Sequence, residues 1–171
     1  MSERIFNALF LCSANSARSI MGESLLRHYG KGRFNTFSAG SHPKDKPHPM
    51  AIDLLRALDM PTDGLASKSW DVYAKFDAPK MDFVFTVCDT LAREKNPTWP
   101  GKPMTAHWAV FDPVAVEGSD MERADAFRRA YRELENRIKI FTSLRIEALS
   151  RMAIKEKLDE IGGGRRIEPA A

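Results

Sequence analysis

Cysteine and histidine are scarce in this chain, and their scarcity excludes several kinds of protein. The 171 residues include two cysteines and four histidines. Two cysteines cannot build the disulfide framework of a small secreted domain, so a reducing cytoplasm is the expected location. The histidines do not have the spacing of metal ligands, so no metal site is predicted. The chain also has no Gly-x-Gly-x-x-Gly or Gly-x4-Gly-Lys loop, which argues against a nucleotide.

Long apolar runs and charge of a single sign are missing as well. No stretch approaches the ~18 uncharged apolar residues of a membrane span, and the first predicted strand leaves no room for a signal peptide. The 26 lysines and arginines are interleaved with 23 acidic residues, which gives a net charge of +3 without a basic stripe. We therefore expect neither a nucleic acid nor a membrane as a partner.

Short strand-like segments alternate with helical patterns along the chain. The strand candidates are 5–11, 34–39, 82–87 and 104–110, and helices are expected at 19–29 and 49–58. Such alternation predicts an α/β fold in which a parallel sheet carries helices on both faces. At this length we expect a single domain, 1–160. Three consecutive glycines from Gly162 predict a flexible tail, 161–171.

A third, longer helix is marked at its start by a capping box. Ser119 is the predicted N-cap, and Glu122 lies at the spacing that lets its side chain bond back to the N-cap backbone. Apolar residues then recur at spacings of four and three, at Phe127, Tyr131, Leu134, Ile138 and Phe141. Such a stripe can bind a partner, but it normally packs on the protein's own core, and we expect it to face the sheet.

The most informative motif is Cys12-Ser13-Ala14-Asn15-Ser16-Ala17-Arg18-Ser19, between the first strand and the first helix. A cysteine and an arginine separated by five residues can close a loop around a tetrahedral oxyanion. Successive backbone N–H groups in such a turn form an anion nest, and the helix N-terminus adds about half a positive charge. The same positive electrostatic field stabilises a thiolate, so the loop and the helix N-terminus can form both the nucleophile and the anion site.

Two further polar residues follow strand candidates, Cys88 after 82–87 and Asp112 after 104–110. Ligands of open α/β sheets bind beyond the carboxyl ends of the strands, so both residues are expected near Cys12. Asp112 can act as a general acid, although an Asp-Pro pair also forms ordinary turns. Cys88 can resolve a covalent adduct on Cys12, although a cysteine at the end of a buried strand is often only a small apolar residue.

Five segments together make the chain similar to a known family. Besides Leu9–Ser19 they are Phe-Ser-Ala-Gly at 37–40, Ser-Lys-Ser-Trp-Asp at 67–71, Phe-Thr-Val-Cys-Asp at 85–89 and Ala-His-Trp-Ala-Val-Phe-Asp-Pro at 106–113. They resemble the low-molecular-weight protein tyrosine phosphatase superfamily, and most closely its arsenate reductases. The resemblance implies a flavodoxin-like three-layer sandwich whose four-stranded parallel sheet has the order 2-1-3-4.

The resemblance also implies a role for each candidate residue. Cys12 is the implied nucleophile, Arg18 the oxyanion ligand, Asp112 the acid and Cys88 the second redox cysteine. Asn15 and Ser19 are implied to shape the loop and to stabilise the thiolate. The implied oxyanion-binding residues are Ser13, Ala14, Asn15, Ser16, Ala17 and Arg18.

The implied reaction is the reduction of arsenate to arsenite, with phosphate and sulfate as analogues of the substrate. Cys12 attacks arsenate, Cys88 then attacks the Cys12 sulfur, and arsenite departs from a Cys12–Cys88 disulfide. No bound cofactor is implied. An external reductant such as glutathione with glutaredoxin, or thioredoxin, would restore the thiols.

Three positions depart from the pattern of the family. Ala14 replaces a usual glycine, which would cost about 1 kcal/mol if the position required a positive φ. Asn96 stands where many relatives carry a third cysteine, so electron transfer within this chain must end at Cys12 and Cys88 or at a mixed disulfide with a small thiol. Lys68 stands where some potassium-dependent members carry a carboxylate, so its ammonium group can take the place of the ion.

Two other functions remain open from the sequence. One is hydrolysis of phosphotyrosine or another phosphomonoester, but Val114-Ala115-Val116 follow Asp112-Pro113 where phosphatases of this family offer aromatic residues to the substrate ring. Hydrolysis also has no use for Cys88. The other is an oxyanion-binding module without turnover. Asn96 fits that reading, whereas the intact Cys12, Arg18, Ser19 and Asp112 favour an enzyme.

Overall fold

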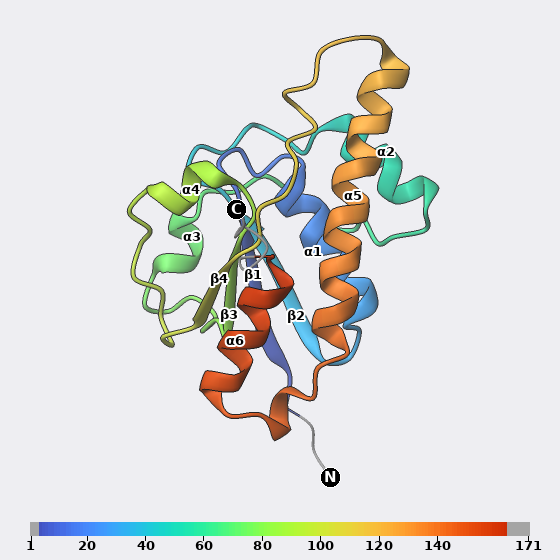
Figure 1. Cartoon of the computed structure of the whole chain (residues 1–171). Coiled ribbons are helices and arrows are strands. Elements are labelled where there is room, and N and C mark those ends of the chain that lie inside the picture. Colours follow the sequence, from blue (N-terminus) through green and yellow to red (C-terminus); the bar gives the residue numbers. More distant parts are fainter. Residues whose placement is uncertain (1–3, 164–171) are drawn as a thin grey trace, which may run out of the picture.

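The structure is a computed structural model that describes residues 4–163. Its four strands are β1 (Phe6–Leu11), β2 (Phe34–Ala39), β3 (Phe83–Thr86) and β4 (Met104–His107). They form one parallel sheet in the order β2-β1-β3-β4 (Figure 1). The predicted fold class and strand order are confirmed.

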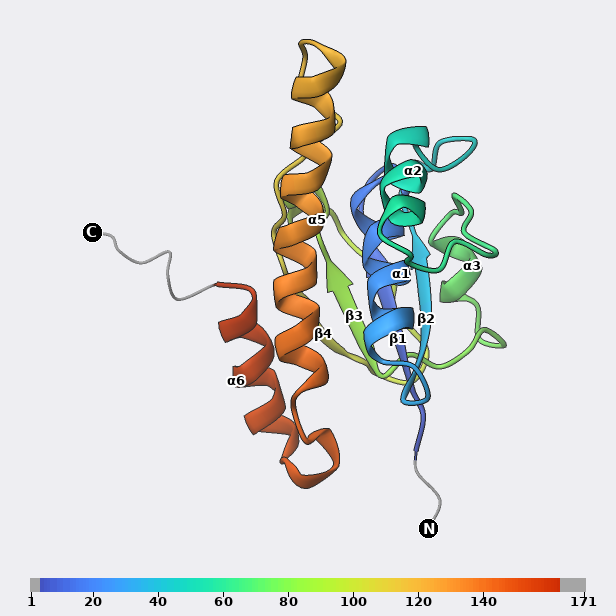
Figure 2. The ribbon, with the colours of Figure 1, turned by 90° about the vertical axis from the view of Figure 1, so that its right-hand side faces the viewer.

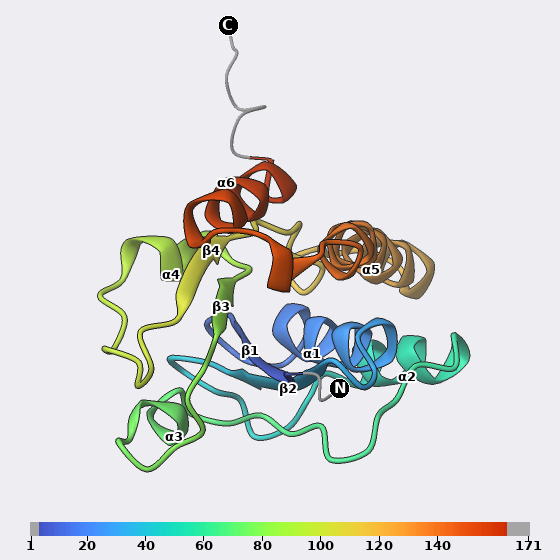
Figure 3. The same cartoon turned by 90° about the horizontal axis from the view of Figure 1, so that it is seen from below.

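Helices cover both faces of the sheet, as predicted. One face carries α1 (Arg18–Tyr29), α5 (Asp120–Thr142) and α6 (Arg151–Ile161), with α2 (Pro49–Ala57) beside α1 and α5. The other face carries two short helices, α3 (Asp71–Ala74) and α4 (Asp89–Arg93), on the opposite side from α1 and α5 (Figure 3). A 3₁₀ turn, η1 (Ile146–Ala148), joins α5 to α6. Among residues 4–163, no helix has the length and apolarity that crossing a membrane requires.

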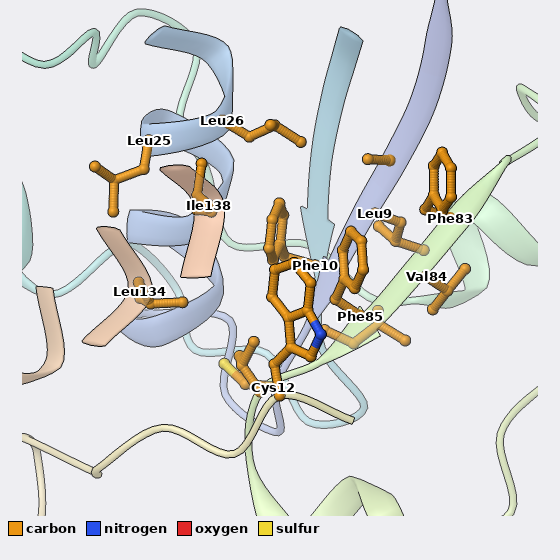
Figure 4. Close-up of a cluster of buried hydrophobic side chains, with 14 of the residues drawn as sticks. Leu9, Phe10, Cys12, Leu25, Leu26, Phe83, Val84, Phe85, Leu134 and Ile138 are labelled. Carbon is orange, nitrogen blue, oxygen red and sulfur yellow. The ribbon is translucent and has the colours of Figure 1, made fainter. Parts of the chain in front are cut away.

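The apolar core lies between the sheet and the layer of α1 and α5. Phe85 of β3 stacks on Trp108, with ring centroids 4.0 Å apart, and the Phe141 ring meets Phe85 edge-on at 5.3 Å. Cys12 is part of the same buried cluster, near the end of β1 (Figure 4). The nucleophile candidate is therefore packed against the apolar core.

The long helix α5 begins and packs as its sequence predicts. Ser119 accepts a hydrogen bond from the Glu122 N–H, and the Glu122 side chain accepts one from the Ser119 N–H. All five residues of the predicted stripe are buried, so the stripe faces the core. Figure 2 shows that the first turns of α5 extend beyond the sheet.

The predictions for the fourth strand and for the C-terminal part need correction. β4 ends at His107, three residues before the predicted end at Val110, because its partner β3 ends at Thr86; single backbone bonds from the Trp108 and Val110 N–H groups to Thr86 and Val87 follow. The short helices α3 and α4 and the helix α6 were not predicted. Of the predicted tail 161–171, Ile161 is the last residue of α6, and 164–171 lie outside the described residues.

Candidate active site

The loop 12–17 joins β1 to α1 at the carboxyl end of the sheet, the same end at which α4 begins (Figure 1). Cys12 is buried, with 3% of its surface exposed. The N-cap of α1 is Ala17, which provides no side-chain acceptor, and the first turn has no acidic residue. The positive end of α1 therefore faces the loop without a negative side chain of the helix to neutralise it.

Two surrounding segments hold the loop by its carbonyl groups. Four consecutive carbonyls accept hydrogen bonds at 2.6–3.0 Å: Ser13 from the His42 N–H, Ala14 from the Lys44 N–H, Asn15 from the Ser67 hydroxyl and Ser16 from the His48 N–H. In a trans peptide the N–H points away from the C=O of the same unit. Carbonyls fixed outward therefore turn the intervening N–H groups toward the centre of the loop, the arrangement that an oxyanion needs.

Asn15 is the residue of the loop with left-handed backbone, at φ 46°. Its fully buried side chain donates to the Ser19 hydroxyl at 2.8 Å and accepts from the Lys68 N–H at 2.8 Å. Asparagine tolerates this backbone region better than most residues do. Ala14 is not among the described residues with positive φ, so the strain considered for it does not arise.

Ser19 links Asn15 to the thiol of Cys12. The Ser19 oxygen lies 3.0 Å from the Cys12 sulfur and also accepts the bond from Asn15. The bond from Asn15 leaves the Ser19 O–H available for the sulfur, and either partner of the Ser19–Cys12 bond can be the donor. The Ser19 hydroxyl and the N-terminus of α1 thus both lie beside the Cys12 sulfur.

Arg18 and Asp112 meet across the mouth of the loop. The Arg18 guanidinium lies 3.5 Å from the Asp112 carboxylate and donates to the Val110 carbonyl at 3.2 Å. The Arg18 side chain is 16% exposed, whereas that of Asp112 is 43% exposed. The cation is thus fixed in the wall of the site, and the acid stands at its entrance.

Cys88 lies directly against the oxyanion loop. Its sulfur accepts a hydrogen bond from the Ser13 N–H at 3.3 Å, and the residue is 2% exposed. Burial raises the pKa of the Cys88 thiol, while hydrogen bonds from the backbone at Leu91 and Ser13 lower it in part. The Cys88 sulfur therefore lies against the peptide unit that joins Cys12 to Ser13.

A cavity of about 430 Å³ opens beside these residues. Its lining includes Arg18, Cys88 and Asp112, together with Arg129 and Glu133 from α5. The structure thus brings the predicted residues of three strand ends into one site. It adds Arg129 and Glu133, which in the sequence look like any other ion pair at a spacing of four on a solvated helix face.

The segment 40–48 also belongs to the site, although its sequence predicts only a loop. A side chain at Gly40 would place its Cβ 2.5 Å from the Ser13 carbonyl oxygen and 2.6 Å from that of Cys12. Glycine is therefore required where the segment passes the oxyanion loop. His48 contributes its backbone N–H to Ser16 and its side chain to the start of α2, where it accepts from the Met50 N–H.

A buried polar cluster lies behind the loop. Glu23 accepts bonds from Ser38 at 2.6 Å and from Arg27 at 3.0 Å. Burial lowers the pKa of the Lys68 ammonium group, and the Glu23 carboxylate acts in the opposite direction. Among residues 4–163, no group of three His, Cys, Asp or Glu side chains is placed to hold a metal ion.

Asn96 packs against the end of α4. Its side-chain amide donates to the carbonyls of Leu91 and Glu94 at 3.4 and 3.5 Å. These weak bonds lie at the end of α4, whose N-cap is Cys88. The side chain here has a local structural contact and no redox capacity.

Comparison with known proteins places this chain in a family. The model of the low molecular weight phosphotyrosine protein phosphatases matches residues 7–155. The chain belongs to this family. Among curated relatives, an arsenate reductase of Shouchella clausii is 31% identical over 141 residues, which is 82% of this chain and 96% of the relative.

Solved structures of other proteins share the fold at lower identity. An arsenate reductase from Archaeoglobus fulgidus superposes with a TM-score of 0.63 at 22% identity and covers 80% of this chain and 99% of its own. The tyrosine phosphatase AmsI of Erwinia amylovora has a TM-score of 0.59 at 24% identity, and the match covers 86% of this chain and 95% of AmsI. The low-molecular-weight phosphatase scaffold therefore occurs in proteins of both names, and the residues of the site must decide between the two activities.

Proposed function

We propose that this protein reduces arsenate to arsenite with Cys12 as the nucleophile and Cys88 as the resolving thiol. The observation that carries the proposal is the hydrogen bond from the Ser13 N–H to the Cys88 sulfur, which puts a second thiol on the wall of the oxyanion loop. Hydrolysis of a phosphoester needs a single thiol. Reduction needs two electrons, which two thiols supply when they form a disulfide.

In the first step the Cys12 thiolate attacks As(V). A sulfur–arsenic bond forms and an arsenic–oxygen bond breaks. Arg18 and the inward N–H groups of the loop hold the remaining oxygens, and the Asp112 carboxyl gives its proton to the oxygen that leaves as water. Phosphate and sulfate have the same tetrahedral shape and are expected to compete for the site.

In the second step Cys88 loses its proton and attacks the Cys12 sulfur. The sulfur–sulfur bond forms as the sulfur–arsenic bond breaks, and the bonding pair stays on arsenic, which leaves as arsenite. The protein is oxidised by two electrons and arsenic is reduced by two. This accounting requires no bound cofactor.

An external thiol reduces the disulfide and closes the cycle. Both cysteines are buried, so a Cys12–Cys88 disulfide would lie inside the site rather than on an exposed loop. We therefore propose that glutathione with glutaredoxin, or a similar small thiol, is at least as effective as thioredoxin. Because the reaction starts from free thiols, the reducing cytoplasm is the proposed compartment.

The competing activity, phosphomonoester hydrolysis, would use Cys12, Arg18 and Asp112 without Cys88. Purified protein should form one arsenite per chain from arsenate in the absence of a reductant, and peptide mapping should then link Cys12 to Cys88. The Cys88→Ser variant should stall in arsenate reduction but retain any hydrolysis of aryl phosphates.

Equal loss of both activities in a folded Cys88→Ser variant would contradict the resolving role. Free thiols beside stoichiometric arsenite would contradict the disulfide. A cycle that turns over with thioredoxin alone would reject the argument from access to the reductant.

A further inference from the structure

The segment that carries Asp112 has left the sheet and runs without regular structure to the start of α5. Two of its hydrogen bonds stay within the segment: Asp112 accepts from the Val114 N–H at 3.0 Å, and Pro113 accepts from the Val116 N–H at 3.3 Å. Phe111, the residue before Asp112, is bonded to a different element. The Phe111 N–H donates to the Glu133 carboxylate at 2.9 Å, so α5 holds the backbone one residue before Asp112.

The same carboxylate is fixed through its second oxygen. Arg129, one turn earlier on α5, donates to it at 3.2 Å, and the Arg129 guanidinium carbon lies 3.9 Å from the centroid of the Phe111 ring. Phe111 is thus held by its N–H and by its ring. We call Phe111, Arg129 and Glu133 the α5 clamp.

The clamp rests on a rigid support. Glu133 is followed by Leu134, which is fully buried in the core, and α5 runs for 23 residues. An exposed ion pair at a spacing of four contributes little to stability on its own. The Glu133 carboxylate, however, also accepts the N–H of Phe111, so it constrains the position of the neighbouring Asp112.

We propose that Glu133 is a positioning residue for Asp112. This inference rests on the proposed function, because it takes Asp112 as the proton donor. Glu133 exchanges no proton. It holds the chain at Phe111 so that the half-exposed Asp112 carboxyl stays within hydrogen-bond reach of the departing oxygen beside Arg18, and misplacement of a catalytic group by about 1 Å can cost about 100-fold in rate.

The test is a double-mutant cycle of Glu133→Ala and Asp112→Asn. It is read as single-turnover arsenite formation at saturating arsenate. Glu133→Ala should slow this step by roughly 10- to 100-fold. The phosphate concentration that protects Cys12 from alkylation should change by less than the rate, because the hydrogen bonds of Glu133 go to the Phe111 N–H and to Arg129. In the Asp112→Asn background, Glu133→Ala should have no further effect, since no acid is left to position.

Two companion variants keep the test sharp. Glu133→Gln retains an oxygen that can accept the Phe111 N–H, so it should recover most of the rate, and it replaces Glu133→Ala if that variant does not fold. Glu135→Ala is the matched control, because Glu135 lies on the same helix and accepts a bond from the Tyr29 hydroxyl at 2.6 Å on another side. It should leave the single-turnover rate unchanged.

Three results would overturn the inference. The first is an unchanged rate in Glu133→Ala. The second is that Glu133→Ala slows the single turnover by the same factor with Asp112 present and in the Asp112→Asn background. The third is a normal rate in Asp112→Asn, which would remove Asp112 as the acid and the inference with it. The mapping of the Cys12–Cys88 disulfide is independent of these measurements, so a failure of the clamp is distinguishable from a failure of the reductase chemistry.

Discussion

Asn15 is the residue on which most of the local geometry depends. It combines a left-handed backbone with bonds to Ser19 and to the segment at Lys68, and its carbonyl accepts the Ser67 hydroxyl. A single side chain therefore orients the hydroxyl beside Cys12 and ties the loop to its surroundings. The family resemblance implies a shaping role for Asn15, but the backbone strain expected at Ala14 lies one position later, at Asn15 itself.

Two substitutions at Asn15 separate its backbone role from its side-chain role. Asn15→Gly accepts the positive φ and loses only the side-chain bonds. Asn15→Ala loses the same bonds and adds the cost of a left-handed alanine, about 1 kcal/mol. We expect both variants to have a lower free energy of unfolding, with Asn15→Ala lower by about that difference.

Chemical denaturation of the two variants measures this difference. Equal stabilities would mean that the backbone at position 15 is not strained in either variant. In both variants the arsenate reduction rate should fall, because the Ser19 hydroxyl loses its orientation toward Cys12. A normal rate in both variants would show that catalysis does not require Asn15 to orient the Ser19 hydroxyl.

At the scale of elements, the site depends on segments that press against the loop. The close approach of Gly40 to the Ser13 and Cys12 carbonyls leaves no room for a methyl group. Gly40→Ala must therefore displace the loop or the end of β2. We expect weaker protection of Cys12 by phosphate, by about 10-fold or more, since the displaced N–H groups no longer converge on the anion.

Gly22→Ala serves as the control for this prediction. Its added Cβ would lie 2.8 Å from the Phe10 ring, so it disturbs core packing without touching a loop carbonyl. It should lower the free energy of unfolding and leave phosphate protection nearly unchanged. If both variants weaken protection equally, general destabilisation explains the effect, and the specific contact of Gly40 does not.

The elements also show where sequence reasoning succeeds and where it stops. The sheet, α1, α2 and α5 carry periodic apolar residues or a capping box, and all were predicted. The helices α3 and α4 have four and five residues, too short for a periodic pattern to be visible. β4 ends early because its partner β3 ends at Thr86, a limit set by pairing with another strand that the apolar pattern of 104–110 does not encode.

The same division holds for the site. Cys12, Arg18, Cys88 and Asp112 follow strand candidates, and the rule for the carboxyl ends of parallel strands brought them together. The backbone donors of 42–48 and the carboxylate of Glu133 act through geometry. In the sequence they are a polar loop and a surface ion pair, so the structure is needed to find them.

At the scale of the whole molecule, the three tyrosines join different parts of the fold. The Tyr29 hydroxyl of α1 donates to Glu135 of α5, Tyr131 is buried in α5, and the Tyr73 ring of α3 meets Phe37 of β2 at 5.3 Å. The pKa of each is raised to about 12, by the Glu135 hydrogen bond and burial for Tyr29 and by burial first for the other two. The folded protein therefore resists ionisation of all three.

This resistance predicts an alkaline limit to stability. An unfolded tyrosine ionises near pH 10, well before its folded counterpart, so the stabilising contribution is complete below about pH 10 and is lost as the pH rises toward about 12. The raised pKa of the Cys88 thiol acts in the same direction. Lys68 acts oppositely, because its pKa is lowered and rising pH relieves the cost of its buried charge. As the pH rises, three tyrosines and one thiol lower the free energy of unfolding and one lysine raises it. The net effect is therefore a loss of stability.

Denaturant unfolding at a series of alkaline pH values, with tyrosinate absorbance recorded on the folded protein, tests this balance. The free energy of unfolding should fall steadily above about pH 10, and the absorbance of folded protein should rise only near the unfolding transition. Tyr29→Phe should make the fall shallower, because one of the three ionisations is removed, and it should leave phosphate protection of Cys12 unchanged. Tyrosinate that appears near pH 10 while the chain is still folded would show that the hydroxyls are accessible, and the alkaline limit would then need another cause.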